Sequence, residues 1–592
     1  MVSADQHQER RAKFLDRTLL VFFIILGLRL FQMQVLRGSV YHEKSESNHI
    51  RQIPLPASRG VISDRNGCVL ADNRPSYSLY IVPYEFQKNA ADAEVIASTL
   101  GLSVNEIEKK IKESDAGPFT PVRLIQDMDF KTLSIIVENR LDLPGVFYRA
   151  EPVRVYPSHA KCSHVIGYLG EIGKSELKSL ESHGYNRGDQ IGKTGIEKKY
   201  DHWLRGENGY KYVEVDVRGR EIGNFGGERD VASVPGYNLK LTLDSELQYR
   251  VENLMEGKRG AVIVVDPRNG EILSMVSKPD YDLNSFAVKL NPDLWKQFQN
   301  DPGKPLLHRA IQAQLPPGST YKLITAIAAL EKKSVSSDFE TVCDGSYRLG
   351  RRIYHCWKKD GHGRVNFTDA IVGSCNVYFY ELILQTGLES WIDYSELFGF
   401  GRKTGVDLEE ENSGLLPDIR YLNQKYGKKG WGKGMWLNLT VGQGDLLVTP
   451  IQMVMLASEI GMEGRVAVPH LLQAIQDPVT EIWKEFEPEK RESMPLSSGT
   501  YDQVKTAMFG VIHANGGTGV LARVPGVRAC GKTGTAQNPQ GKDHAWFIGF
   551  APMEDPEISL VVLIENGGSG GGAAAPIAGS IFRWFLKTRR TT

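Results

Sequence analysis

Leu315-Pro316-Pro317-Gly318-Ser319-Thr320-Tyr321-Lys322 leads directly into a run that is almost entirely apolar from Leu323 to Leu330. Because this run is apolar on nearly every side, it predicts a helix buried inside a large domain. Residues three apart share one face of a helix, so the Lys322 amine can reach the Ser319 hydroxyl. Burial lowers the pKa of a lysine and favours the neutral amine, which can take a proton from serine. The stretch therefore predicts a serine nucleophile with a lysine base.

The bulk composition sets the scale of the fold around this helix. A length of 592 residues and an apolar content of 41% predict two or three domains with at least one large core. Lysine plus arginine equals aspartate plus glutamate, at 71 each, so no overall field attracts the chain to nucleic acid. No repeat of roughly 20 to 50 residues is visible, and the only low-complexity stretch is Gly567 to Ala575.

The N-terminus contains a segment apolar enough to cross a membrane. Thr18 to Leu36 is mostly apolar and spans about 28 Å as a helix, which suffices for one crossing. The alternative is a cleaved signal peptide, but no small-x-small cleavage site follows the run. More basic residues precede the run than follow it closely, so residues 1–17 are expected to form a cytoplasmic tail, with 18–36 as a retained anchor. Everything after the anchor then lies outside the cytoplasm.

The pattern changes near Val234-Pro235-Gly236, which predicts a domain boundary. Residues 37–236 mix strand-like and helical patterns and show no clustered catalytic chemistry. We expect them to form a non-catalytic pedestal that acts as a spacer or partner-binding module.

Residues 237–592 carry the second predicted domain. A helix from Asp244 to Met255 and a hairpin around Asn269-Gly270 open it, and a helix-rich middle follows. Late strands are expected at Ala545 to Phe550 and at Ile558 to Ile564. This order predicts an α+β fold in which helices cover an antiparallel sheet.

Short motifs alone cannot select a site in this chain. Ser-x-x-Lys also occurs at Ser158 and Ser175, and Lys-Thr-Gly also occurs at Lys193 and Lys403, where the context predicts turns. Lys532-Thr533-Gly534-Thr535 differs, because it follows a strand-like segment that can pair with a later strand. Ser374-Cys375-Asn376 falls between the two good candidates. Three elements in order are far more specific than any one of them.

The ordered triplet Ser319-x-x-Lys322, Ser374-x-Asn376 and Lys532-Thr533-Gly534 resembles that of the penicillin-recognising serine transferases. Further elements are similar to class B penicillin-binding proteins over nearly the whole chain: the anchor, Ser58-Arg59-Gly60, Gly442-Gln443-Gly444, and Val448 to Met453. Cys356-Trp357-Lys358-Lys359 with Gly361-His362-Gly363 resembles a local pattern of the elongation enzymes among them. The resemblance implies a single-pass protein of the bacterial inner membrane, with a dimerisation-type pedestal and a transpeptidase domain in the periplasm.

The same resemblance implies a role for each motif. Ser319 would attack the carbonyl between two D-alanines of a peptidoglycan stem peptide, Lys322 would take the hydroxyl proton, and Ser374 would relay a proton to the leaving amine. Asn376, Lys532, Thr533 and Thr535 would bind the substrate or its β-lactam mimic, with the backbone N–H groups of Ser319 and Thr535 as the oxyanion hole. The catalytic residues implied are thus Ser319, Lys322, Ser374, Asn376, Lys532, Thr533, Gly534 and Thr535.

The same motifs are also compatible with a division-specific transpeptidase, a β-lactamase or a β-lactam sensor. The resemblance also implies a D,D-carboxypeptidase side activity. A class A β-lactamase needs a Glu-x-x-Leu-Asn element, and neither Leu422-Asn423 nor Leu437-Asn438 is preceded by the glutamate. A sensor needs a cytoplasmic effector, for which the tail before Thr18 is too short. The resemblance implies a RodA-type glycosyltransferase and an MreC-type scaffold as partners.

Cysteine and histidine cluster in one short stretch with the spacing C-x12-C-x5-H-x12-C, formed by Cys343, Cys356, His362 and Cys375. Three thiolates and one imidazole make a complete tetrahedral set for structural zinc. Related enzymes carry zinc with acidic residues in place of some cysteines, so this sequence departs from that variant. The alternative is a Cys343–Cys356 disulfide with a free Cys375. No cofactor is expected for catalysis itself.

Overall fold

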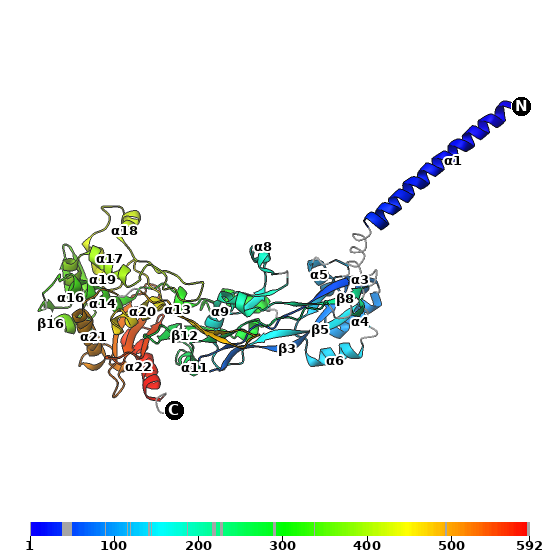
Figure 1. Ribbon diagram of the computed structural model, residues 1–592. Coiled ribbons are helices and arrows are strands. Elements are labelled where there is room, and N and C mark those ends of the chain that lie inside the picture. The colour runs from blue at the N-terminus through cyan, green and yellow to red at the C-terminus, as the bar shows by residue number, and fades with distance from the viewer. Residues whose placement is uncertain are drawn as a thin grey trace. The chain divides into compact units, whose positions relative to one another are not determined.

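The computed structural model divides the chain into two compact units that are each discontinuous in sequence. Unit 1 comprises residues 1–58, 75–152 and 207–234, and unit 2 comprises residues 59–74, 153–206 and 235–592. The structure describes residues 2–37, 50–88, 90–114, 117–118, 120–139, 143, 145–185, 188–215, 221–224, 229–287, 292–336, 338–491 and 494–588. Figure 1 shows the elements of both units.

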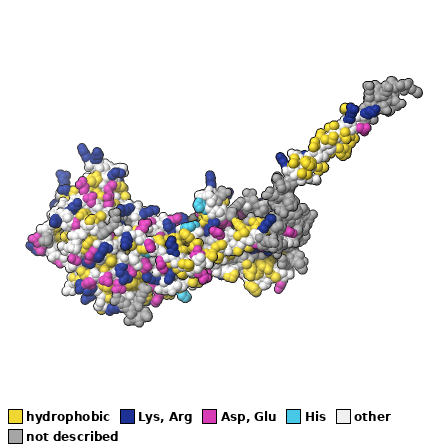
Figure 2. Space-filling model, viewed as in Figure 1, with side chains coloured by type: hydrophobic (Ala, Val, Ile, Leu, Met, Phe, Trp, Pro, Cys, Tyr) yellow, Lys and Arg dark blue, Asp and Glu magenta, His cyan; other side chains and the backbone are white. Residues whose placement is uncertain are grey.

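The N-terminal segment is one long helix, as predicted. Helix α1 (Val2–Phe31) continues as a π-helix, η1 (Gln32–Leu36). Within it, Lys13–Leu36 has a mean hydropathy of 2.1, and none of its most apolar window is buried against protein. Figure 2 shows hydrophobic side chains gathered along this helix with Lys and Arg near its start. An exposed apolar helix of this length suits a single membrane anchor.

Unit 1 is a small α/β body with a core of its own. One sheet has the order β1-β8-β9, and the end of β3 pairs with β4 and β5. Apolar residues of α4, α5 and α6, among them Ile96, Ile107 and Ile136, pack with Leu79 and Leu124 of these strands. The helices are α3 (Pro83–Lys88), α4 (Ala90–Leu100), α5 (Val104–Ser114) and α6 (Phe130–Glu138). The strands are β1 (Ile50–Leu55), β3 (Val69–Ile81), β4 (Val122–Ile125), β5 (Val146–Val155), β8 (Gly209–Val215) and β9 (Glu221–Asn224), of which β3 and β5 have residues in both units.

The first segments of unit 2 are joined by a buried ion cluster. Glu197 is fully buried and accepts from Arg59 Nε at 2.5 Å and from Arg154 Nε at 2.7 Å. Arg154 also donates to the Gly60 carbonyl at 2.7 Å, and Arg59 to Asp201 at 2.7 Å. Residues distant in sequence are therefore fixed to one another by charge-assisted bonds. The helices in this part are α7 (Ser163–Ile166), α8 (Lys174–Leu180), α9 (Gly195–Lys199) and α10 (Asp201–Leu204).

A mixed sheet in unit 2 has the order β18-β17-β10-β2, followed by the start of β3. Strand β10 pairs with β17 in antiparallel and with β2 in parallel register. The strands are β2 (Ile62–Ser63), β10 (Asn238–Leu241), β17 (Leu472–Gln476) and β18 (Trp483–Glu485), and β6 (Leu169–Glu171) and β7 (Gln190–Gly192) form a separate pair.

The centre of unit 2 is an antiparallel five-stranded sheet with the order β12-β11-β21-β20-β19. Both faces are covered, so alternate residues enter different cores: Ile263 packs on the side of α14 and α20, and Val262 on the side of α11 and α22. The predicted hairpin, the late strands and the helix-covered sheet are confirmed. The strands are β11 (Gly260–Val265), β12 (Ile272–Lys278), β19 (Cys530–Ala536), β20 (His544–Ala551) and β21 (Ile558–Ile564).

Most of the remaining helices of unit 2 are labelled in Figure 1, and α11, α13, α20, α21 and α22 contact the five-stranded sheet. These remaining helices are α11 (Ser245–Leu254), α12 (Pro292–Asn300), α13 (Arg309–Gln312), α14 (Lys322–Glu331), α15 (Phe367–Val372), α16 (Asn376–Thr386), α17 (Leu388–Leu397), α18 (Ile419–Tyr426), α19 (Lys433–Thr440), α20 (Pro450–Gly461), α21 (Ser498–His513) and α22 (Ala575–Arg583). Two short strand pairs lie between α14 and α15 in sequence: β13 (Thr341–Cys343) with β16 (Gly363–Val365), and β14 (Ser346–Leu349) with β15 (Arg352–His355).

Candidate active site

Ser319 lies in a 3-10 turn, η5 (Gly318–Tyr321), that leads into the buried helix α14. Gly318 adopts a left-handed φ of 58°, and a Cβ there would lie 2.7 Å from the Thr535 carbonyl oxygen. Only glycine suits both the backbone angle and this close approach. The turn therefore brings Ser319 beside the strand that carries Lys532 to Thr535. Leu323 to Ala329 are buried, so the helix is enclosed as its apolar pattern predicts.

Lys322 is completely buried and makes three hydrogen bonds. Its Nζ donates to the Ser374 carbonyl at 2.8 Å, to Ser374 Oγ at 3.3 Å and to Asn376 Oδ1 at 2.7 Å. Burial lowers the pKa of Lys322 to about 8. Within the described residues, no hydrogen bond joins this amine to the Ser319 hydroxyl, so the predicted proton transfer between them requires a small movement.

Lys532 approaches the same serine from the sheet. Its Nζ donates to Ser374 Oγ at 3.0 Å and to the Thr533 carbonyl at 3.1 Å. Burial, and then the charge of Lys322, hold the pKa of Lys532 well below its usual range. Ser374 is 52 residues from Lys322 and 158 from Lys532, yet both amines reach its hydroxyl. Two buried lysines on one hydroxyl can move a proton between the nucleophile and a leaving group.

The Lys532-Thr533-Gly534-Thr535 motif lies on β19, an edge strand of the five-stranded sheet. Thr533 Oγ1 donates to Thr518 Oγ1 at 2.7 Å, and the Thr535 hydroxyl accepts from the Gly570 N–H at 3.3 Å. Thr535 is exposed, unlike its neighbours, so its hydroxyl is open to a ligand.

Sequence reasoning did not assign Thr518 or Gly570 to the site. Gly570 belongs to the glycine-rich stretch after β21, where a Cβ would lie 2.3 Å from the Gly534 and Trp546 carbonyl oxygens. The glycine run was therefore the signal for a close backbone approach to the motif strand. Thr518 shows no comparable signal.

The rejected motif copies lie away from the sheet. Lys193-Thr194-Gly195 forms the start of α9, with Thr194 as the N-cap, and Lys403-Thr404-Gly405 is a loop in which Thr404 donates to Glu411. Ser175 lies on the short helix α8, and Ser158 lies in the irregular segment after β5. Context selects the same copies that the structure brings together.

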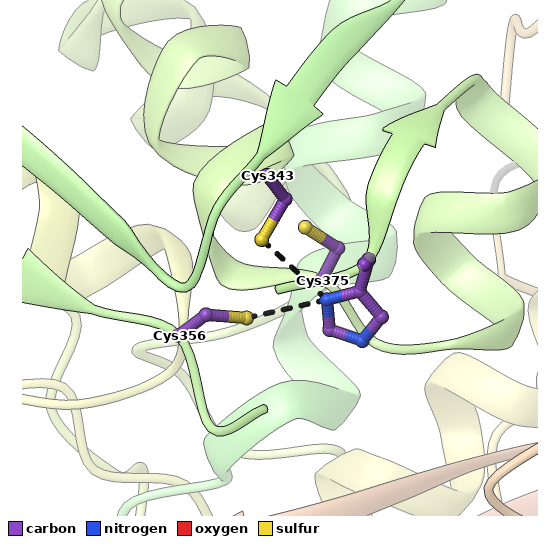
Figure 3. A group of neighbouring side chains, drawn as sticks. Cys343, Cys356 and Cys375 are labelled. Carbon is purple, nitrogen blue, oxygen red and sulfur yellow. Dashed lines mark hydrogen bonds between the residues drawn. The ribbon is translucent and has the colours of Figure 1, made fainter. Parts of the chain in front are cut away.

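The four predicted metal ligands form one cluster, in which all ligand atoms lie within 4.8 Å of one another. His362 Nδ1 is 3.6 Å from Cys343 Sγ and 3.5 Å from Cys356 Sγ. Tetrahedral zinc with its usual bond lengths places sulfur and nitrogen about 3.6 Å apart, so the geometry fits. Figure 3 shows the three cysteine sulfurs turned toward one another and toward the imidazole.

The second nitrogen of the histidine orients the ring. His362 Nε2 lies 3.1 Å from the Gly373 carbonyl, which can only accept, so Nε2 carries the proton and the Nδ1 lone pair faces the sulfurs. A hydrogen bond from Cys375 lowers the pKa of Cys356. All six cysteines are free thiols, so the alternative Cys343–Cys356 disulfide is absent from the structure.

The cluster is attached to the segment that carries Ser374 and Asn376. Cys375 lies between Ser374 and Asn376, and the Asn376 N–H donates to Cys356 Sγ at 3.3 Å. Asn376 Nδ2 also donates to the His355 carbonyl at 3.2 Å. The side chain that binds Lys322 is thus held by the segment that supplies the metal ligands.

Known proteins are similar to this chain along nearly its whole length. The profile described as penicillin binding protein transpeptidase domain matches residues 260–583, and that described as penicillin-binding protein dimerisation domain matches residues 54–241. The peptidoglycan D,D-transpeptidase MrdA of Haemophilus influenzae is 32% identical, with 99% of this chain and 93% of that protein covered. MrdA of Escherichia coli is 32% identical over 97% of this chain and 94% of that protein. The solved complex between penicillin-binding protein 2 and MreC from Helicobacter pylori matches with a TM-score of 0.78 and 29% identity, covering 91% of this chain and all of that one.

Proposed function

This chain belongs to the penicillin-binding protein transpeptidases, and from that premise we propose that it crosslinks peptidoglycan stem peptides during cell-wall elongation through an acyl-enzyme on Ser319. The predicted resemblance to class B penicillin-binding proteins is confirmed. The enzyme is a peptidoglycan D,D-transpeptidase by family, like the MrdA proteins that it matches along nearly its full length.

The convergence of Lys322 and Lys532 on the Ser374 hydroxyl carries the assignment of roles. Ser319 Oγ bonds to the carbonyl carbon between two D-alanines, and its proton passes to Lys322. The tetrahedral oxyanion is stabilised by the backbone N–H groups of Ser319 and Thr535. The peptide C–N bond then breaks, and Ser374 delivers the proton to the departing D-alanine. An amine of a neighbouring stem peptide takes the acyl group and frees Ser319.

Labelled penicillin tests this assignment. The wild type is expected to retain the label for many minutes, and Ser319→Ala to retain none. Ser175→Ala is the matched control, because it removes the serine of a second Ser-x-x-Lys sequence on an exposed helix. Rapid release of hydrolysed label from the wild type would identify a β-lactamase instead. Failure to crosslink lipid-linked precursor in membranes would refute the transferase assignment.

The elongation role is supported by the likeness to MrdA and penicillin-binding protein 2. Depletion of the protein is expected to make rod-shaped cells round. Filamentation on depletion would instead assign the enzyme to division.

The Cys343, Cys356, His362 and Cys375 set is proposed to hold structural zinc. Four protein ligands leave no position for a reacting water, so the ion would brace the Ser374 loop rather than take part in the chemistry. Elemental analysis of the purified protein is expected to give about one zinc per chain. Cys375→Ser should lose the metal, whereas Cys530→Ala, which replaces a buried cysteine outside the cluster, should keep it. Protein without zinc and with two fewer free thiols would support the disulfide.

Topology and partners follow from the same family. We place residues 1–17 in the cytoplasm, residues 18–36 in the inner membrane and the residues after this anchor in the periplasm. An MreC-type scaffold is the expected partner because the matched Helicobacter pylori protein is solved in complex with MreC. A RodA-type glycosyltransferase is expected to supply the glycan strand. Copurification of these proteins with the full chain from membranes tests both partners.

A further inference from the structure

Ser374, whose hydroxyl accepts a hydrogen bond from both lysines, has a strained backbone. Its φ is 56°, in the left-handed region that side chains other than Gly, Asn and Asp rarely adopt. Such a conformation persists only where the surroundings hold it, and it occurs often at functional sites. Contacts to the peptide groups on either side of Ser374 are therefore needed to keep its hydroxyl in place.

One side chain touches both of those peptide groups. The Trp357 indole N–H is 3.1 Å from the Gly373 carbonyl and 3.1 Å from the Ser374 carbonyl. The Gly373 carbonyl belongs to the peptide plane before Ser374, and the Ser374 carbonyl to the plane after it. The angles φ and ψ of Ser374 together relate these planes, so a donor shared by both oxygens restricts both angles. The Ser374 carbonyl is also the acceptor for Lys322 Nζ, at 2.8 Å.

The position of the Trp357 ring suits a local clamp rather than a core residue. The side chain is 58% exposed, so little of its area packs inside the protein. Its ring meets the His362 imidazole edge to face, with centroids 5.5 Å apart. An indole needs only one partner for its N–H, and here that donor points inward at the loop while the ring stays at the surface.

We propose that Trp357 is a positioning residue that clamps the two peptide groups flanking Ser374 and so keeps the Ser374 hydroxyl between Lys322 and Lys532. The inference rests on the proposed function, because it concerns the acylation of Ser319. Trp357 acts through Ser374 and takes no part in bond making. Its loss should slow proton delivery to the leaving nitrogen and leave substrate binding unchanged.

The test uses the full chain in detergent with two β-lactams that differ in their side chains. Trp357→Phe removes the N–H, and 3-benzothienylalanine at position 357 replaces only the N–H by sulfur, with the ring shape retained. Stopped-flow acylation separates the dissociation constant from the first-order acylation rate constant. Losing one neutral hydrogen bond is expected to lower the acylation rate constant roughly three- to tenfold, by the same factor for both compounds and with the dissociation constants unchanged. Trp483→Phe, a half-exposed tryptophan on β18, is the matched control and should behave as wild type.

The outcomes are distinct. An unchanged acylation rate constant in both Trp357 variants would overturn the inference. A rise in the dissociation constant that differs between the two β-lactams would also overturn it, because the ring would then contact the substrate directly. If the wild type itself is not acylated by either β-lactam, the proposed function is refuted, and the inference about Trp357 is refuted with it. Should Trp357→Phe lose thermal stability, the benzothienyl variant alone decides.

Discussion

Two buried amines that share one hydroxyl cannot both be charged at low cost. Lys322 and Lys532 are each fully buried, and both donate to Ser374 Oγ. Burial disfavours each ammonium, and the charge of Lys322 further lowers the pKa of Lys532. The pKa of Lys322 falls to about 8, so part of this lysine is neutral near neutral pH. That neutral form can act as the base that the proposed nucleophile Ser319 needs.

Acylation is therefore expected to depend on pH through Lys322, whose pKa is about 8. Below that pH the amine is mostly protonated and cannot accept the Ser319 proton, so the rate falls as pH falls. The second-order acylation rate constant with labelled penicillin, measured from about pH 6 to pH 10, should rise with its midpoint near pH 8 and level off about one unit higher. Circular dichroism at each pH controls for unfolding. A flat profile in folded protein would exclude Lys322 as the base.

The apolar run after Ser319 was enough to predict a buried lysine, because burial follows from composition and helical periodicity. The actual partners of the amine could not be predicted. Lys322 binds Ser374 and Asn376, which reach it only because α14 and α16 pack together. The left-handed φ of Ser374 had no signal either, because glycine and asparagine, the residues that usually mark such an angle, do not occupy this position.

At the scale of elements, β19 depends on a glycine that contributes no side chain. Gly570 follows β21 and packs on the backbone of β19 and β20, with space for no Cβ. Its N–H bonds to the Thr535 hydroxyl. The low-complexity stretch therefore packs against β19, the strand that carries Lys532 to Thr535. The position of Thr535 depends on this contact as well as on strand pairing.

Gly570→Ala should displace this strand. The added methyl group would overlap the Gly534 and Trp546 carbonyl oxygens, and overpacking of this kind costs about 1 to 3 kcal/mol. A lower thermal midpoint and slower acylation are both expected. Gly499→Ala is the control, because a Cβ at Gly499 in α21 meets nothing within 4 Å. If the Gly570→Ala variant is acylated at the wild-type rate, the close contact of Gly570 with β19 and β20 is not needed for activity.

The Glu197 cluster ties the early segments of unit 2 together. Glu197→Ala removes the carboxylate partner of buried Arg154 and leaves Arg59 with Asp201 alone, which should cost about 3 to 5 kcal/mol in the free energy of unfolding. Glu554→Ala breaks an exposed pair with Arg528 and should cost less than about 1 kcal/mol. Urea denaturation of both variants measures the difference. Equal losses would contradict the structural role of Glu197.

The strands and the hairpin of the five-stranded sheet could be predicted because each is specified by a local apolar pattern or a turn. The Glu197 ion cluster could not be predicted. Arg59 and Glu197 are 138 residues apart, and nothing local indicates that they meet. For the same reason, the inclusion of residues 59–74 and 153–206 in unit 2 was not foreseen from the sequence.

In the whole molecule, the charges of the two signs balance, whereas one long helix at the N-terminus is strongly apolar. The chain has no net charge, with 71 residues of each sign, so long-range attraction contributes little to where it goes. The exposed helix from Lys13 to Leu36 is instead long and apolar enough to cross a membrane. Localisation is therefore expected to depend on that helix and not on the surface of the rest of the chain.

Deletion of residues 1–37 separates localisation from folding. None of the most apolar window of Lys13–Leu36 is buried against protein, so its loss removes no packing from the described residues. The shortened chain should unfold at the same temperature as the full chain in detergent and should be acylated by labelled penicillin at the same rate. It should no longer sediment with membranes, because a spanning helix supplies an attachment that peripheral contacts do not equal. A fall in the unfolding temperature would mean that the helix packs on the protein, and continued sedimentation would mean that another surface binds the membrane.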